Sequence, residues 1–67
     1  MQKVRIFLKP PDAFIKFRYN PDVVDIMHAF NGRYDRKTKL WKIPSDTHKS
    51  LYEELKSQMY DVKIIRV

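Results

Sequence analysis

Apolar and polar residues alternate in two short stretches near the N-terminus. In residues 4–8 every second side chain is apolar, which is typical of a half-buried β-strand. Residues 13–19 repeat the alternation, and Pro10-Pro11-Asp12 separates the two stretches because proline has no N–H to give to a sheet. The pattern therefore predicts two strands joined as a hairpin. The apolar sides of the two strands hold Val4, Ile6, Leu8, Ile15, Phe17 and Tyr19.

A helix is predicted directly after this hairpin. Asn20 suits the N-cap, Pro21 suits the first helical position, and Asp22 complements the positive end of the helix dipole. Asn31-Gly32 ends the helix, and Gly32, the only glycine of the chain, is expected in the left-handed conformation of a C-cap. The apolar stripe at helical spacing consists of Val23, Val24, Met27 and Phe30.

Residues 33–44 predict two further short strands around a tight loop. Asp35 and Thr38 flank Arg36-Lys37, which is a suitable composition for a type I turn. Tyr34 lies on one arm of this second hairpin, and Trp41 alternates with Ile43 on the other.

A second helix is expected to begin at Ser45 or Asp46, and a last strand to cover residues 62–67. With 67 residues the chain is one domain, residues 1–67, with a single modest core. The predicted fold is a small two-layer α+β domain in the order β-β-α-β-β-α-β, with a twisted sheet and both helices on one face. The inward stripe of the second helix is predicted to be His48, Leu51, Tyr52, Leu55 and Met59.

Charge is distributed unevenly along this pattern. The formal net charge is +6, with a pI near 9.8, which favours polyanionic partners and nucleic acid first. Residues 3–18 and residues 33–42 each carry a net charge of +4, whereas residues 21–30 and 45–61 each carry −2. If both acidic helices cover one face of the sheet, the opposite face is cationic.

Two phenylalanines, Phe7 and Phe14, fall on that cationic face. One interpretation is that they stack bases inside a cationic groove, the common design for binding single strands. The other is that they are cross-strand neighbours that shield each other, with the lysines keeping the sheet edges soluble.

The sequence gives little support to an enzyme. It holds no cysteine, no phosphate-binding glycine loop and no metal-ligand motif, so no catalytic residue, metal or cofactor is predicted. The nearest enzymatic alternative is a small basic ribonuclease toxin with His28 or His48 as general base. No stretch approaches the length of a membrane span, so we expect no membrane association and an intracellular, soluble protein, cytoplasmic or in the nucleoid, or nuclear in a eukaryote.

Residues 15–56 resemble the HARP domain, the small module beside the motor of annealing helicases and of related phage and prokaryotic helicases. The shared features are a strand ending in "YNP", a helix, a hairpin reading "RYDRKTKLWKIP", and a helix with Tyr52 and Leu55. The resemblance implies a non-catalytic accessory domain that binds forked DNA or junctions of single and double strands. It also implies that Tyr34 and Trp41 are core residues that anchor the hairpin.

One departure from the family is that no ATPase follows, so the chain is expected to be either a domain cut from a longer helicase or a stand-alone protein. The alternative function is a protein-interaction module that docks its basic sheet on an acidic partner or on a helicase motor. For the DNA-binding function, the expected phosphate contacts are Arg5, Lys16, Arg18, Arg33, Arg36, Lys37, Lys39 and Lys42, with Phe7 and Phe14 as stacking candidates.

Overall fold

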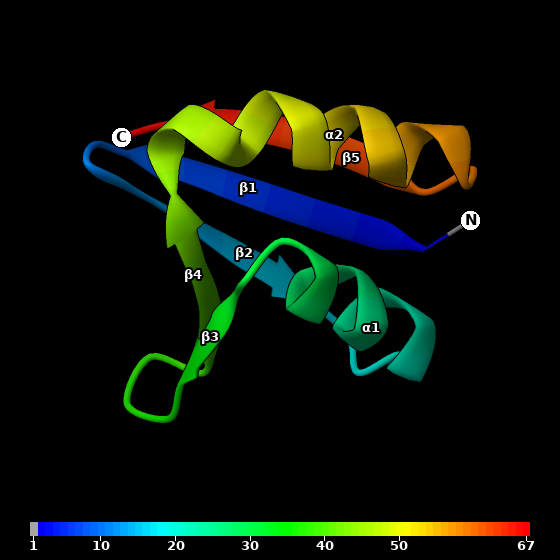
Figure 1. Ribbon diagram of the computed structural model, residues 1–67, viewed down its shortest axis with the longest axis horizontal. Helices are drawn as coiled ribbons and strands as arrows, with labels where there is room; N and C mark the ends of the chain where they lie inside the picture. Colours follow the sequence, from blue (N-terminus) through cyan, green and yellow to red (C-terminus); the bar gives the residue numbers. More distant parts are fainter. Residues whose placement is uncertain (1) are drawn as a thin grey trace.

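The fold is a five-stranded sheet with two α-helices on one of its faces (Figure 1). A computed structural model describes residues 2–67. This arrangement confirms the predicted α+β class and the element order, with a short 3₁₀ turn, η1, added before the second helix. The elements are β1 (Lys3–Lys9), β2 (Asp12–Phe17), α1 (Pro21–Ala29), β3 (Arg33–Asp35), β4 (Leu40–Pro44), η1 (Ser45–Thr47), α2 (His48–Ser57) and β5 (Asp61–Arg66).

The strands are ordered β3-β4-β2-β1-β5 across the sheet. The pairs β1–β2, β2–β4 and β3–β4 are antiparallel, whereas β5 runs parallel to β1 at the far edge. In Figure 1 the first and last strands lie side by side, and the β3–β4 turn projects from the lower left of the molecule.

A single apolar core lies between the sheet and the helices. The register places the buried strand residues on one face, because Ile6 is opposite Ile15 and Ala13 is opposite both Leu8 and Ile43. Among residues 2–67 no polar or charged side chain is buried. Removal of this apolar area from water is the main stabilising term for such a small domain. The core consists of Val4, Ile6, Leu8, Ala13, Ile15, Val23, Ile26, Met27, Ile43, Leu51, Leu55 and Val62.

Helix α1 begins as its sequence predicts. The Asn20 side chain accepts a hydrogen bond from the Asp22 N–H at 2.9 Å, which satisfies one of the unpaired amide groups at the helix start. The same side chain donates through Nδ2 to Gln2 Oε1, and Gln2 Nε2 donates to the Arg18 carbonyl, both at 2.6 Å. The cap therefore also ties the start of β1 to the end of β2.

The end of α1 corrects the prediction for Gly32. Asn31, with φ of 59°, adopts the left-handed conformation, and Gly32 does not. The N–H groups of Asn31 and Gly32 donate to the carbonyls of His28 and Met27, which is the pattern of a Schellman cap. Gly32 is needed for a different reason: a Cβ there would lie 2.9 Å from the Met27 carbonyl oxygen.

Helix α2 starts later and ends earlier than predicted. Residues Ser45–Thr47 form η1, and α2 ends at Ser57 in a second Schellman cap with Met59 at φ of 70°. Met59 is 73% exposed, so its expected place in the inward stripe is wrong. The reason is that the helix has already ended when the chain reaches this residue.

One strand prediction also extended too far. We expected the second strand to reach Tyr19, but β2 ends at Phe17 and Tyr19 lies 79% exposed in the connection to α1. The backbone must leave the sheet here to reach the Asn20 cap, and proline at position 21 excludes a continued ladder.

Candidate nucleic-acid interface

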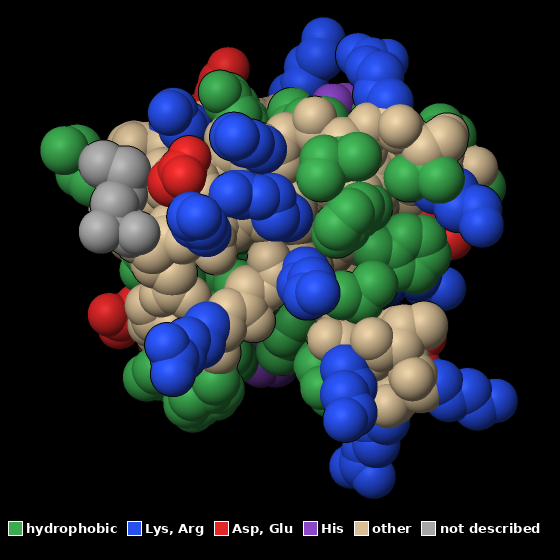
Figure 2. Space-filling view, turned by 180° about the vertical axis from the view of Figure 1, so that it is seen from behind, with side chains coloured by type: hydrophobic (Ala, Val, Ile, Leu, Met, Phe, Trp, Pro, Cys, Tyr) green, Lys and Arg blue, Asp and Glu red, His purple; other side chains and the backbone are tan. Residues whose placement is uncertain are grey.

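The face of the sheet opposite the helices carries most of the cationic side chains of the strands. Within residues 2–67 no helix covers this face, and we call it the open face (Figure 2). Figure 2 shows hydrophobic side chains gathered near its middle with lysine and arginine around them, and more cations on the projecting hairpin at the lower right. By register the charged residues of the open face are Lys3, Arg5, Lys9, Lys16, Arg33, Lys42 and Lys63, with Asp12, Asp35 and Asp61.

One row across the open face joins the two basic hairpins. Arg33 is opposite Lys42, Lys42 is opposite Phe14, Phe14 is opposite Phe7, and Phe7 is opposite Ile65 of β5. Cations from both +4 clusters, which are far apart in the sequence, therefore share one surface. The next row places Lys16, Arg5 and Lys63 beside one another.

A broad groove of about 890 Å³ crosses the end of this face where β2 finishes, and we call it the sheet groove. Four cations and two phenylalanines line it, which is the combination of phosphate and base contacts that single-strand binding uses. Its lining residues are Gln2, Lys3, Arg5, Phe7, Lys16, Phe17, Arg18 and Ile65.

A second groove of about 440 Å³ lies between the sheet and the β3–β4 turn, and we call it the hairpin groove. Phe7, Lys16, Thr38, Lys39 and Leu40 line it. Because Phe7 and Lys16 line both grooves, the two form one cationic track from the end of β2 to the hairpin.

The two phenylalanines are not equivalent in this geometry. They are direct cross-strand partners and each is half-buried, as the shielding interpretation requires. Phe7, however, lines both grooves, whereas Phe14 is not among their lining residues. Phe7 is thus the better placed of the two for contact with a base.

Two of the expected phosphate contacts are partly engaged within the protein. Arg5 is half-buried, and its Nη1 donates to the carbonyls of Val4 and Asp61 at 3.2 and 3.3 Å. Lys42 Nζ lies 3.9 Å from Asp12 Oδ2 in an exposed pair, which contributes little to stability. Arg5 is therefore held in a fixed position, while Lys42 can leave its aspartate for a phosphate at small cost.

The β3–β4 turn holds Arg36 and Lys37 at its exposed tip. The Asp35 carboxylate accepts a hydrogen bond from the Lys37 N–H at 2.9 Å, and the Asp35 carbonyl accepts one from the Lys39 N–H at 2.7 Å. The bond from Lys37 holds the pKa of Asp35 below its ordinary value, because it favours the charged carboxylate. Lys39, the last residue of the turn, adopts the left-handed conformation with φ of 59°.

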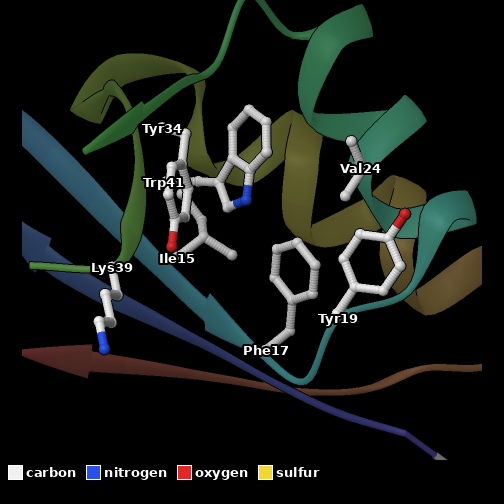
Figure 3. Close-up of a pocket in the computed structure, with 7 residues that line it drawn as sticks. All are labelled: Ile15, Phe17, Tyr19, Val24, Tyr34, Lys39 and Trp41. Carbon is white, nitrogen blue, oxygen red and sulfur yellow. The ribbon is translucent and has the colours of Figure 1, made fainter. Parts of the chain in front are cut away.

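A third cavity, of about 370 Å³, lies on the helix side of the sheet between α1 and the second hairpin, and we call it the aromatic cleft (Figure 3). Tyr34, expected in the core, is 49% exposed here, and Trp41 is half-buried. Their ring centroids are 5.4 Å apart, and His28 of α1 meets Trp41 edge-on at 5.3 Å. The lining residues are Ile15, Phe17, Tyr19, Val24, Tyr34, Lys39 and Trp41.

Several residues of this surface were not among the predicted contacts. Lys3 follows the same alternation as Arg5 and could have been included from the sequence alone. Lys63 and Ile65 join the open face only because β5 pairs in parallel with β1, and no local pattern indicates that pairing.

Comparisons with protein-family models, curated proteins and solved structures found no match. The HARP resemblance therefore remains a prediction that depends on the residues quoted for it. Of the helices within residues 2–67, none combines the length and apolar character needed to cross a membrane. In the same residues no three acidic or histidine side chains lie close enough together to hold a metal ion.

Proposed function

We propose that this chain is a non-catalytic DNA-binding domain that holds single-stranded or forked DNA on its open face. In keeping with the HARP resemblance, it would serve as an accessory module of a helicase or ATPase, in the same chain or in trans. The observation that carries the proposal is the continuous track made by the sheet groove and the hairpin groove, with lysines and arginines around the shared Phe7.

The charge distribution supports the same function. Both helices carry their exposed acids on the other side of the molecule from this track, including Asp22 and Asp25 of α1 and Glu53 and Glu54 of α2. A polyanion would therefore be attracted more strongly to the open face than to the outer surfaces of the two helices. Phosphate contacts then supply most of the affinity, which is expected to be weak and strongly dependent on salt.

Single strands suit the track better than a duplex does. Phe7 can stack only with a base that is unpaired and exposed, and stacking of this kind does not depend on sequence. A duplex offers phosphates but keeps its bases stacked inside, so it would use the cations and leave Phe7 unused. Forked DNA presents both forms next to each other.

Fluorescence anisotropy with labelled forked, single-stranded and duplex DNA at low salt tests this proposal. We expect forked and single-stranded DNA to bind more tightly than duplex, and K16E/K39E to weaken binding by more than tenfold. The matched control K49E/K56E makes the same charge change on exposed lysines of α2 and should leave the order of affinities unchanged.

Absence of binding to any of the three DNA forms would refute the proposal. The open face would then be better explained as a surface that docks on an acidic protein, such as a helicase motor. That alternative predicts that K16E/K39E prevents co-purification with such a partner, and that DNA has no effect on the complex.

A further inference from the structure

We infer that the aromatic cleft receives one unpaired base of the DNA strand bound on the open face, and that Lys39 contacts the phosphate next to that base. This inference rests on the proposed DNA-binding function and adds a second site to it, on the opposite side of the sheet. Two observations carry it: the aromatic lining of the cleft, and the position of Lys39 in both the cleft and the hairpin groove.

The cleft presents aromatic rings from two parts of the chain. In Figure 3, Tyr34 and Trp41 extend from the second hairpin, while Phe17 and Tyr19 come from the end of β2 and the segment that follows it. His28 packs edge-on against Trp41, which fixes the indole from the α1 side. Tyr19, at 79% exposed, is in contact with water over most of its surface when no ligand is present.

This arrangement fits a flat aromatic ligand. The Tyr34 and Trp41 rings are already 5.4 Å apart and tilted by 58°, so no base fits between them. A base would instead lie in the cleft beside this pair, with Phe17 and Tyr19 on its other side. The volume of about 370 Å³ lies within the usual range of about 300–1,000 Å³ for small-ligand sites.

Charge distinguishes a nucleotide from other ligands of aromatic clefts. Among the described residues that line the cleft, Lys39 is the one charged side chain, and none is a carboxylate. A cationic ligand such as a methylated ammonium group would meet no carboxylate among these residues. A base attached to a phosphate places its ring among the aromatics and its negative charge on the lysine.

Lys39 also gives the strand a route into the cleft. The track on the open face runs from the sheet groove through Phe7 and Lys16 to the hairpin groove, and Lys39 lines the end of it. The same residue lines the aromatic cleft. A strand that follows the track therefore reaches the cleft by passing around the edge of the second hairpin.

This second site would give the domain a preference for DNA ends and junctions. A base within a duplex must be unstacked and unpaired before it can enter a protein pocket, which costs a few kcal/mol. A base at a fork or in a single strand is already available. The cleft therefore adds affinity only for DNA with unpaired bases, whereas the cations of the track also bind duplex.

The test uses a short single strand in which each base in turn is replaced by an abasic site. Loss of one stacked base is expected to weaken binding about tenfold at one position near one end of the bound strand. Y19A and Y34A alter exposed tyrosines and should remove this difference, so that intact and abasic strands bind equally. K49A on α2 serves as the control and should keep the difference.

Trp41, the only tryptophan, gives a second readout that needs no variant. Its fluorescence should be quenched by the intact strand, and much less by the strand that is abasic at the sensitive position. Equal binding of all abasic strands, with Trp41 fluorescence unchanged, would overturn the cleft assignment while DNA binding itself remained.

Two further results would also overturn the inference. Absence of DNA binding altogether would refute the proposed function and the cleft site with it. If a proline-rich peptide quenched Trp41 where DNA did not, the cleft would be a site for extended peptides, which also bind among aromatic side chains.

Discussion

Salt dependence gives a quantitative test of the track, because each phosphate that a lysine or arginine neutralises releases condensed counterions. Five cations line the two grooves: Lys3, Arg5, Lys16, Arg18 and Lys39. For single strands each contact contributes about −0.7 to the slope of log K against log salt, so the expected slope is about −3.5. Between 50 and 200 mM salt the affinity should then fall about 100-fold.

Neutralising two of these lysines should change the slope by a known amount. K16Q/K39Q removes one residue shared by both grooves and one residue at the hairpin end of the track. The slope should drop to about −2.1, and the loss of affinity over the same salt range should shrink to about 20-fold. Anisotropy titrations at four or five salt concentrations measure both quantities.

The control for this prediction is K49Q/K56Q, which removes the same charge from α2. Its two lysines are exposed and lie outside both grooves, so its slope should stay at about −3.5. The reasoning fails if K16Q/K39Q keeps the wild-type slope. It also fails if both double variants lower the slope equally, since only the net charge would then matter.

Three further predictions concern the fold that supports the track. G32A should destabilise the domain by about 1–3 kcal/mol in urea unfolding, because its Cβ would lie 2.9 Å from the Met27 carbonyl oxygen. M59G should be neutral or stabilising by up to about 1 kcal/mol in the same assay, because Met59 is exposed at φ of 70°, a conformation that glycine adopts without strain. By NMR, the Asp35 carboxyl should titrate below its ordinary pKa of 3.8. The stabilisation that the charged carboxylate gives the turn is then complete above pH 3.8, and it is lost as the pH falls through the lowered pKa. A titration at 3.8 or above would show that the bond from Lys37 does not form.

Local patterns in the sequence were sufficient for most of the fold. The alternation around Val4 and Ile6 identifies the buried side of β1, and Asn20-Pro21 locates the start of α1. These signals depend on neighbours a few residues apart, where side-chain period and capping chemistry act. The cationic nature of the open face followed from the same patterns once both helices were placed on one side.

The errors arose where the outcome depends on contacts distant in sequence or on competing local geometries. Asn and Gly both tolerate the left-handed conformation, so the dipeptide Asn31-Gly32 does not by itself show which residue adopts it. Position 32 requires glycine because the Met27 carbonyl oxygen lies too close for a Cβ there. The HARP resemblance implies that Tyr34 is a core residue, but β3 is the edge strand and leaves this side chain 49% exposed. The aromatic cleft could not be predicted, since it forms between α1 and a hairpin whose relative positions no local pattern specifies.

The parallel pairing of β5 with β1 has a consequence for the order of folding. The β1–β2 and β3–β4 hairpins need only nearby residues, and hairpins form within about 1–10 μs. Strand β1, in contrast, gains β5 as its second neighbour only after residues 61–66 have left the ribosome. Of the strands within residues 2–67, β5 is the last in chain order. Until then its edge is open to pairing with other chains, a state in which unpaired strands tend to aggregate. Closure of the sheet is therefore a late, long-range step, and the rate at which β5 docks determines how long the nascent domain remains vulnerable.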